Sequence, residues 1–358
     1  MVLLTFSAGL GAEKIAKVCR GLSVEPPVAN STLNQTQADQ APLPHAPTHN
    51  QLEPPSLSPY DIGSFINAQP GSDLTNIWQG LGIRKLNIGG NQKPDANESK
   101  FLTQCGNCQA ESFEYELDGE GGSEVLLRIE DRLKEECRYL VFKWVGEGMN
   151  EWRLLGHIDH DFGRYRMPQH LVLLSGGRPW LVIQGQGASG SGVALYFDRV
   201  FLITRNRLAE VISYNSEGHQ SDFEYTKEFS GHIVSCGIED GLATAEIEFF
   251  VTYFAGDYSK PSHPITLFAK SQKAVLLRRL SNRVATLDVN HSELTHNELD
   301  AVYNIDSLSN EDFLKYNYQE LSRIAQGTDT KRREWLRQFL DACDNTAEQR
   351  RLGQLLAR

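Results

Sequence analysis

The sequence contains no apolar run long enough to cross a lipid bilayer, and basic residues are in the minority. Its 358 residues include 35 Lys and Arg against 46 Asp and Glu, which gives a formal net charge of -11. A membrane-spanning helix needs about 20 consecutive apolar residues, so we expect no transmembrane segment. Nucleic-acid binding depends on a clustered basic surface, so we also expect no nucleic-acid partner. Because 40% of the residues are hydrophobic and 23% are charged, the composition indicates a globular protein.

Complete motifs of the common enzyme classes are absent as well. Residues 185–192 contain the spacing Gly-x-Gly-x-x-Gly, but a strand-like run follows where a dinucleotide-binding turn requires a helix. We therefore expect no nucleotide cofactor. We interpret the segment as a flexible loop, or as one that another backbone segment approaches closely. Its candidate binding residues are Gly185, Gly187, Ser189, Gly190, Ser191 and Gly192.

Cysteine is scarce, and only two of the six cysteines lie close together in the sequence. Cys105 and Cys108 form one Cys-x-x-Cys pair, without the second pair of a zinc site and without the βαβ context of a redox motif. In an exported protein we expect a disulfide between them at the entrance of the domain. In a cytosolic protein we expect ordinary thiols.

The first 100 residues show no globular pattern. Residues 1–21 include an apolar run without a basic leading region, so they are either a truncated or unusual signal peptide or an ordinary apolar N-terminus. Residues 22–100 are rich in Pro, Gln and Asn and predict a disordered linker. Such a linker favours a periplasmic or extracellular protein, and the alternative is a cytoplasmic one.

Residues 101–291 repeat one pattern three times. Each unit begins with a β-hairpin signal and continues with two further strand-like runs, over about residues 113–158, 170–214 and 232–289. The sequence therefore predicts a mainly β domain of three four-stranded antiparallel meanders, in a propeller-like or strongly curved sheet. Three units are few for a closed propeller. We expect the sheet to stay open, to be completed by helices, or to form a homo-oligomer through its open edges.

Residues 292–358 change to a helical period and predict an α-helical C-terminal tail. Ser309 is typical of a helix start, and an apolar face continues from it to Gly327, where the helix should end. Two further helices are predicted over residues 331–342 and 347–357. We expect them to pack on each other or to cover a sheet edge. The alternative is a docking surface built from Lys331, Arg332, Arg333, Arg337, Arg350 and Arg351.

An acidic turn lies between the first two predicted strands. A tight turn that contains glycine can direct several carboxylates to one point, and calcium takes six to eight oxygen ligands. The alternative is a solvated acidic hairpin. The candidate calcium ligands are Glu116, Asp118, Glu120 and Glu124.

This turn resembles the calcium loops of FG-GAP or VCBS-type β-propeller repeats, whose pattern is Asp-x-Asp-Gly-Asp-Gly-x-x-Asp. Asp118, Gly119 and Gly121 match the pattern, whereas glutamates stand at the other acidic positions. The resemblance covers about fifteen residues of the first unit. It implies a propeller-like sheet arrangement and one bound Ca²⁺.

A second polar cluster follows at the end of the first unit. Alternation along a strand would place His157, Asp159 and Asp161 on one face, where imidazole and carboxylate groups suit zinc or a similar ion. The alternative is a polar strand end with satisfied histidines. The full candidate cluster is His157, Asp159, His160, Asp161 and His170.

These observations leave two hypotheses for function. The first is a non-catalytic binding or scaffolding module with a protein or carbohydrate partner, because meander repeats present loops on one rim and no complete catalytic set is visible. The second is a metal-dependent hydrolase that uses the cluster at residues 157–170.

Overall fold

The architecture follows from a computed structural model of the chain. It describes residues 58–72, 74–82, 107–133, 135–145, 152–161, 169–190, 192–204, 206–221, 224–256, 265–280, 285–305 and 308–358. Of His160 and Asp161 it describes only the backbone. The candidate signal segment and most of the predicted linker lie outside these ranges.

The first predicted unit forms a four-stranded sheet in which every neighbouring pair of strands is antiparallel. Its strands, in spatial and chain order, are β1 (Cys108–Tyr115), β2 (Glu124–Asp131), β3 (Glu136–Trp144) and β4 (Trp152–Asp161). Seven of the eight residues of β2 are buried, because this sheet is covered on both faces.

Two helices cover one face of the four-stranded sheet, α2 (Pro59–Ala68) and α3 (Thr75–Gly80). They bury Ile62, Ile66 and Trp78 against residues of β2 and β3. Ser58 caps α2 by accepting a hydrogen bond from the Tyr60 amide, and Pro59 follows at the first helical position. The prediction of a disordered linker through residue 100 is therefore wrong over these helices, because their apolar residues are numerous enough to pack on the sheet.

The second and third predicted units join in one eight-stranded antiparallel sheet. Its strands are β5 (Gln169–Ser175), β6 (Arg178–Gly190), β7 (Val193–Thr204), β8 (Arg207–Ser221), β9 (Tyr225–Glu239), β10 (Leu242–Ala255), β11 (Thr266–Arg279) and β12 (Thr286–Leu287). Residues 217–221 of β8 pair with residues 226–230 of β9, and this pairing joins the two units in one sheet. In the described part of the chain the twelve strands form two sheets and no propeller, so the propeller-like arrangement is not found.

The eight-stranded sheet curves back on itself. Beyond the short stretch of β8–β9 pairing the two halves separate, and the end of β5 reaches β9. There the Ser175 hydroxyl donates to the Cys236 carbonyl oxygen at 2.9 Å and accepts from the Cys236 amide at 2.8 Å. The outer face of β6 and β7 packs on the four-stranded sheet through Leu181, Ile183 and Phe201.

Five helices follow the last strand. They are α5 (His296–Val302), α6 (Asn310–Tyr316), α7 (Tyr318–Gln326), α8 (Thr330–Ala342) and α9 (Ala347–Leu356). The side chain of Ser309 caps α6 as predicted, by accepting from the Asp312 amide. The single helix expected up to Gly327 is interrupted at Asn317, which is fully buried and donates to the Phe313 carbonyl oxygen. Within the described ranges, no helix has both the length and the apolar character required to cross a membrane.

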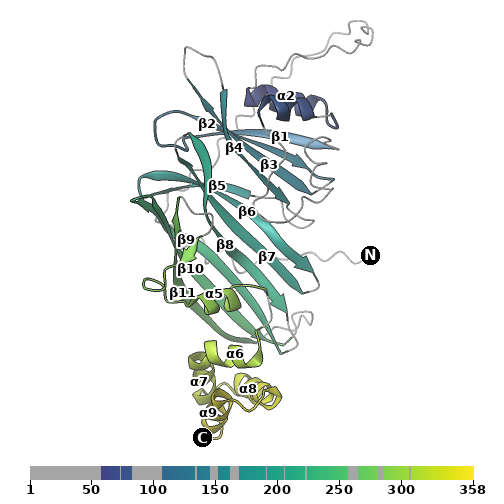
Figure 1. The fold of residues 1–358 in the computed structure, drawn as a ribbon. Coiled ribbons are helices and arrows are strands. Elements are labelled where there is room, and N and C mark those ends of the chain that lie inside the picture. Colours follow the sequence, from purple (N-terminus) through teal and green to yellow (C-terminus); the bar gives the residue numbers. More distant parts are fainter. Residues whose placement is uncertain are drawn as a thin grey trace, which may run out of the picture.

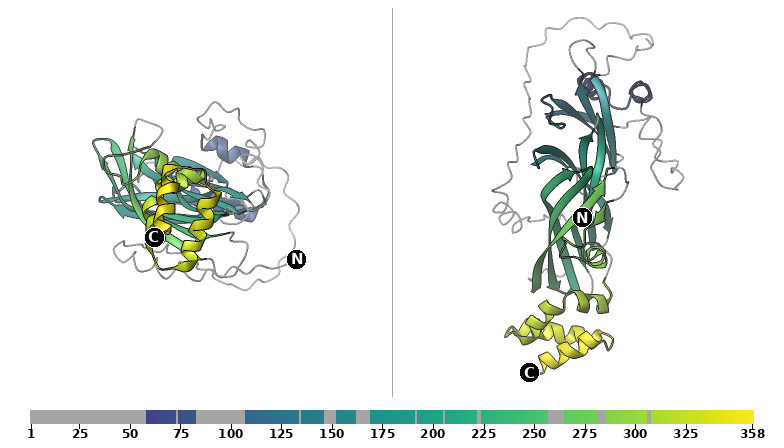
Figure 2. Two further views of the ribbon diagram at one scale, coloured as in Figure 1. Left: turned by 90° about the horizontal axis from the view of Figure 1, so that it is seen from below. Right: turned by 60° about the vertical axis from the view of Figure 1, so that its left-hand side comes forward.

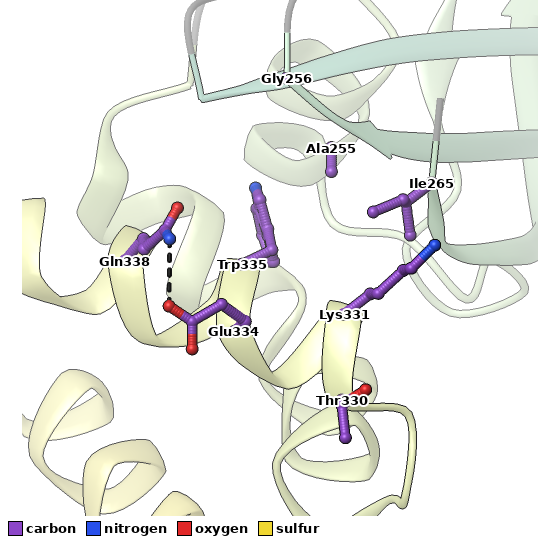
Figure 3. Close-up of a pocket in the computed structure, with 8 residues that line it drawn as sticks. All are labelled: Ala255, Gly256, Ile265, Thr330, Lys331, Glu334, Trp335 and Gln338. Carbon is purple, nitrogen blue, oxygen red and sulfur yellow. Dashed lines mark hydrogen bonds between the residues drawn. The ribbon is translucent and has the colours of Figure 1, made fainter. Parts of the chain in front are cut away.

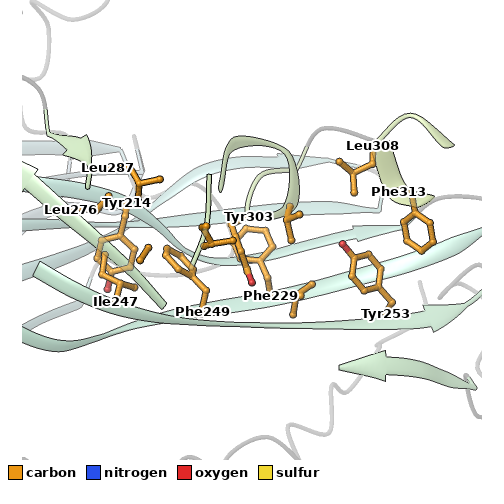
Figure 4. Close-up of a cluster of buried hydrophobic side chains, with 14 of the residues drawn as sticks. Tyr214, Phe229, Ile247, Phe249, Tyr253, Leu276, Leu287, Tyr303, Leu308 and Phe313 are labelled. Carbon is orange, nitrogen blue, oxygen red and sulfur yellow. The ribbon is translucent and has the colours of Figure 1, made fainter. Parts of the chain in front are cut away.

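The C-terminal helices extend the core of the eight-stranded sheet. Figures 1 and 2 show an elongated molecule, with the four-stranded sheet at one end and α6–α9 at the other. The ring of Phe313 lies 4.4 Å from that of Tyr225 and 5.2 Å from that of Tyr253, measured between ring centroids. Figure 4 shows Tyr303, Leu308 and Phe313 beside the aromatic residues of β9 and β10. The helices pack on each other, as predicted, and they also pack on core residues of β9 and β10.

Candidate ligand-binding groove

The acidic turn between β1 and β2 is bound to a lysine. Lys143 on β3 forms ion pairs with Asp118 and, at 2.8 Å, with Glu120. Burial raises the pKa of Asp118, but the hydrogen bonds from Lys143 and the Glu120 amide, together with the positive charge of Lys143, outweigh it, and the pKa lies below its ordinary value. Glu116 accepts from the Gly121 amide at 3.2 Å. The positive charge of Lys143 therefore lies where the resemblance implies Ca²⁺.

Glu124 stands apart from the other acids because it is fully buried. Its carboxyl group accepts from the Leu117 amide at 2.6 Å. Burial, together with the nearby charge of Asp118, raises its pKa. No group of three or more metal-ligating side chains is found within the described ranges, and calcium binding at this turn stays a prediction.

The second candidate cluster divides over two faces of the four-stranded sheet. His157 pairs with Leu140 and Asp159 pairs with Arg138, on the face that packs against α2 and α3. Asp159 is ion-paired with Arg138, and His157 Nε2 lies 3.8 Å from the second oxygen of Asp159. Burial lowers the pKa of His157.

His170 lies on the opposite face, between the two sheets. Its Nε2 is 3.1 Å from the Tyr115 hydroxyl, and its ring contacts Phe113 and Tyr139. Burial lowers the pKa of His170 to about 4. The side chains of His160 and Asp161 lie outside the described part of the structure. The structure therefore brings His157 and Asp159 together but not His170, and a metal-hydrolase site that also uses His160 and Asp161 stays a prediction.

The glycine-rich segment is strand and not loop. Gly185, Gly187, Ser189 and Gly190 belong to β6, and Gly192 alone has a positive φ, of 78°. A β-bulge lies at Gly187. A Cβ atom there would lie 3.3 Å from side-chain atoms of Leu195 and Phe197. The interpretation as a flexible loop is therefore wrong over residues 185–190, and a close approach is found at Gly187. Ser191 lies outside the described residues.

Three of the four cysteines that the structure describes are thiols. Cys137, Cys236 and Cys343 are free, and burial raises the pKa of Cys236 to about 12. Cys108 is disulfide-bonded, with a partner outside the described residues. Cys105 also lies outside them, so pairing of the two stays a prediction.

A groove of about 550 Å³ opens between the two halves of the eight-stranded sheet. The halves separate beyond the β8–β9 pairing, and α5 lies between them. The groove is lined by Phe197, Ser213, Tyr214, Asn215, Phe249, Leu276, Ala285, Thr286, Leu287, His296, Leu299, Asp300 and Tyr303. It is therefore built from β7, β8, β10, β11, β12 and α5.

Fixed aromatic rings form the floor of the groove. The Tyr214 hydroxyl donates to Asp198 at 2.9 Å, and the Tyr303 hydroxyl donates to Gln272 at 3.1 Å. The rings of Tyr303 and Phe249 lie 4.5 Å apart (Figure 4). Because both phenol groups are hydrogen-bonded and all three rings are buried, the floor is rigid.

The rim of the groove is polar. His296 and Asp300 are four residues apart on α5, so they lie on one side of the helix. Ser213 on β8 is exposed across the groove. Within the described ranges, neither His296 nor Asp300 forms an ion pair, which leaves both side chains available to a ligand.

Buried polar contacts hold α5 in place as a wall of the groove. The fully buried Lys227 ammonium donates to the carbonyl oxygens of Asn304 at 2.7 Å and Ala301 at 3.4 Å. Cations are favourable at this end of a helix because its carbonyl groups are unpaired. Asn215 donates to the Tyr303 carbonyl oxygen at 2.9 Å.

A second hollow lies where α8 meets the end of the sheet (Figure 3). Trp335 fills its base, and its indole N–H donates to the Glu224 carbonyl oxygen at 2.9 Å. Glu334 is bound to Gln338 and Arg337 on its own helix. With its acidic group already occupied, this hollow offers fewer free polar groups than the groove.

The predicted basic docking surface is interrupted. Arg333 donates to the carbonyl oxygens of Ala325, Gly327 and Leu356, so its guanidinium joins the ends of α7 and α9. Arg332 is ion-paired with Asp329. The prediction that Arg333 belongs to a docking surface is therefore wrong, because its guanidinium is hydrogen-bonded to carbonyl groups of the neighbouring helices.

The groove has no signature in the sequence. Its residues come from six elements between Phe197 and Tyr303, and no fixed spacing connects them. Of the three polar rim residues, only His296 and Asp300 lie within one element. The chain matches no family model, no curated protein and no solved structure.

Proposed function

We propose that the protein is a non-catalytic binding module that holds a small amphipathic ligand in the groove of the eight-stranded sheet. The observation that carries the proposal is a pre-formed hollow with a rigid aromatic floor and a polar rim, where His296 and Asp300 form no ion pair among the described residues. Its volume of about 550 Å³ lies within the range of roughly 300 to 1,000 Å³ that is typical of small-molecule sites.

The lining indicates the chemistry of the ligand. Phe197, Ala285 and Leu299 are half-buried in the groove and offer apolar surface. At the rim, the Asp300 carboxylate is an acceptor for a hydroxyl or amine. The net charge of -11 disfavours an anion. We infer a ligand with an apolar ring body and a hydrogen-bond-donating head.

A carbohydrate suits the groove less well. Sugar rings bind by stacking on exposed aromatic faces, whereas the Phe249 and Tyr303 rings are each 1% exposed. An enzymatic role has no support from the groove, since among the described residues no hydrogen bond joins the Ser213 hydroxyl, His296 and Asp300 into a nucleophile and base. The disulfide of Cys108 supports the further proposal of an oxidising, periplasmic or extracellular compartment.

Fluorescence titration with 1-aminoanthracene tests the proposal, because this probe has an apolar ring body and an amine head. We expect saturable binding to the full chain. Ser213→Trp fills the groove from an exposed strand position and should weaken binding at least tenfold. Ser235→Trp, at an exposed position of β9 outside the groove, is the matched control and should bind as the wild type does.

A second variant tests the polar rim. Asp300→Asn keeps the size of the side chain and removes its charge, so it should weaken binding of the amine several-fold. Saturable binding that Ser213→Trp leaves unchanged would place the probe elsewhere and contradict the proposal, as would the absence of saturable binding to the wild type.

A further inference from the structure

Sheet edges present unpaired backbone groups, and in the described part of the chain other elements bond to the backbone of three of the four edges. The side-chain amide of Asn67 on α2 pairs with β1 as a neighbouring strand would. Its Nδ2 donates to the Ala110 carbonyl oxygen at 2.9 Å, and its Oδ1 accepts from the Ala110 amide at 2.8 Å. On β4, Arg199 donates to the Asp159 carbonyl oxygen at 3.3 Å. Such contacts prevent the addition of a foreign strand.

The far edge of the eight-stranded sheet is covered beyond the short β12. The Ser292 hydroxyl accepts from the Val275 amide at 2.8 Å, and the Glu293 carboxylate accepts from the Lys273 amide at 2.9 Å. The Glu293 amide donates back to the Lys273 carbonyl oxygen at 2.8 Å. The chain after β12 thus satisfies the backbone of β11 where no further strand pairs with it.

The remaining edge, β5, differs. Within the described part of the chain, no contact of this kind covers the backbone of residues 169–174. The strand has the sequence Gln-His-Leu-Val-Leu-Leu-Ser. It contains neither the charged residues nor the proline that usually protect an edge. Leu171 is 41% and Leu174 is 61% exposed, among the largest values for apolar residues.

We propose that β5 is a dimer interface, at which it pairs antiparallel with β5 of a second copy of this chain. Antiparallel pairing continues the pattern of the whole sheet, and two identical edges can pair in this way only about a two-fold axis. A register centred on Val172 uses all seven residues and places Leu171 opposite Leu173 of the partner subunit.

Charge opposes the approach of a second copy less at this strand than at charged surfaces. Each chain carries a net charge of -11, so two copies repel each other at long range. The uncharged, apolar β5 is where that repulsion opposes contact least. Dimerisation should therefore strengthen as salt screens the repulsion. The interface does not depend on the proposed ligand groove, which lies between the two halves of the sheet.

Sedimentation equilibrium of the full chain tests the proposal. We expect a reversible dimer at micromolar concentration, tighter at 500 mM than at 50 mM salt. Leu171→Lys should raise the dissociation constant at least tenfold, because lysine at an edge opposes strand addition. Leu133→Lys is the matched control: this residue is 73% exposed in the turn between β2 and β3, and its replacement should leave the dimer unchanged.

Cysteine cross-linking tests the register. With Val172 on the axis, it lies opposite Val172 of the partner subunit, with about 4.5 to 5.5 Å between Cα atoms, which is within disulfide reach. Oxidised Val172→Cys should therefore form a covalent dimer. Gln169→Cys should not, because it lies six residues, or about 20 Å, from its counterpart.

A wild-type protein that stays monomeric up to about 100 μM would overturn the proposal. A dimer that Leu171→Lys leaves intact would also overturn it, since the contact would then lie on another surface. Circular dichroism of each variant establishes that a lost dimer is not an unfolded chain.

Discussion

The imidazole of His170 on β5 lies against the ring of Phe113 on β1, with 4.4 Å between ring centroids. This contact joins the edge strands of the two sheets. The rings of Tyr115 and Tyr139 also contact the imidazole, so His170 is surrounded by aromatic side chains. An apolar site of this kind disfavours the charged imidazolium. His170 therefore acts as a neutral part of the sheet interface.

The first prediction concerns pH. The pKa of His170 is lowered by burial from 6.5 to about 4, so the unfolded state binds more protons between these values. Its contribution to the free energy of unfolding is fully present above pH 6.5 and is lost as pH falls toward 4. The loss should approach roughly 3 kcal/mol, since each unit of pKa corresponds to about 1.4 kcal/mol. Urea unfolding from pH 7.5 to 4 measures it.

The variant His170→Gln isolates this residue, because it retains a polar group near Tyr115 but does not titrate. His157 has a lowered pKa and Glu124 a raised one, so both also affect the wild-type profile. The difference between the two profiles removes their contributions. If wild type and variant show parallel profiles, His170 is not a buried neutral group.

The second prediction concerns calcium at the acidic turn. Lys143 already forms ion pairs with both Asp118 and Glu120, so we expect millimolar calcium to leave the wild-type Tm at its value in EDTA. Lys143→Met frees the carboxylates and should create a response. At ten times Kd, calcium would add about 1.4 kcal/mol, or roughly 2 to 4 °C in Tm. A calcium-dependent rise in the wild type, lost in Asp118→Ala, would instead support the propeller-type loop.

The third prediction concerns Lys227, which is fully buried and binds the end of α5. Lys227→Met keeps the length of the side chain but leaves the carbonyl oxygens of Ala301 and Asn304 unpaired. We expect a loss of roughly 1 to 3 kcal/mol in the free energy of unfolding, with weaker binding of 1-aminoanthracene because α5 is a wall of the groove. Lys331→Met, at an exposed helical position, should change neither property.

The fourth prediction separates two arginines of α8. Arg333 donates to carbonyl oxygens at the ends of two other helices, and charged hydrogen bonds of this kind contribute about 1.5 to 3 kcal/mol. Arg333→Leu should cost about that much in chemical denaturation. Arg337→Leu removes only an exposed ion pair with Glu334 and should cost less than about 1 kcal/mol. Equal effects would show that Arg333 does not join the helices.

Much of the local structure could be predicted from the sequence. Alternation along Ala245–Phe254 indicates β10, and the acidic turn indicates the β1–β2 hairpin, because these signals depend only on neighbouring residues. The Ser309 cap is of the same kind. Ser58 and Pro59 are an equally local signal for the start of α2. The proline-rich composition around them led instead to the prediction of a disordered linker.

The candidate sites were less predictable. Alternation correctly places His157 and Asp159 on one face, but His170 belongs to another sheet, and its distance from them depends on how the sheets stack. Likewise, the spacing of the acidic turn gives no sign of Lys143, which reaches it from β3 through strand register.

By itself, the sequence determined the antiparallel strands, the C-terminal helices and the surplus of negative charge, because each is set by local patterns or by composition. Only the tertiary structure decided that the twelve described strands divide into sheets of four and eight, that α5 lies between the halves of the larger sheet, and that β5 is an edge strand. These features arise from contacts between residues far apart in the chain. Their energies depend on the fit of whole surfaces, which no single stretch of sequence contains.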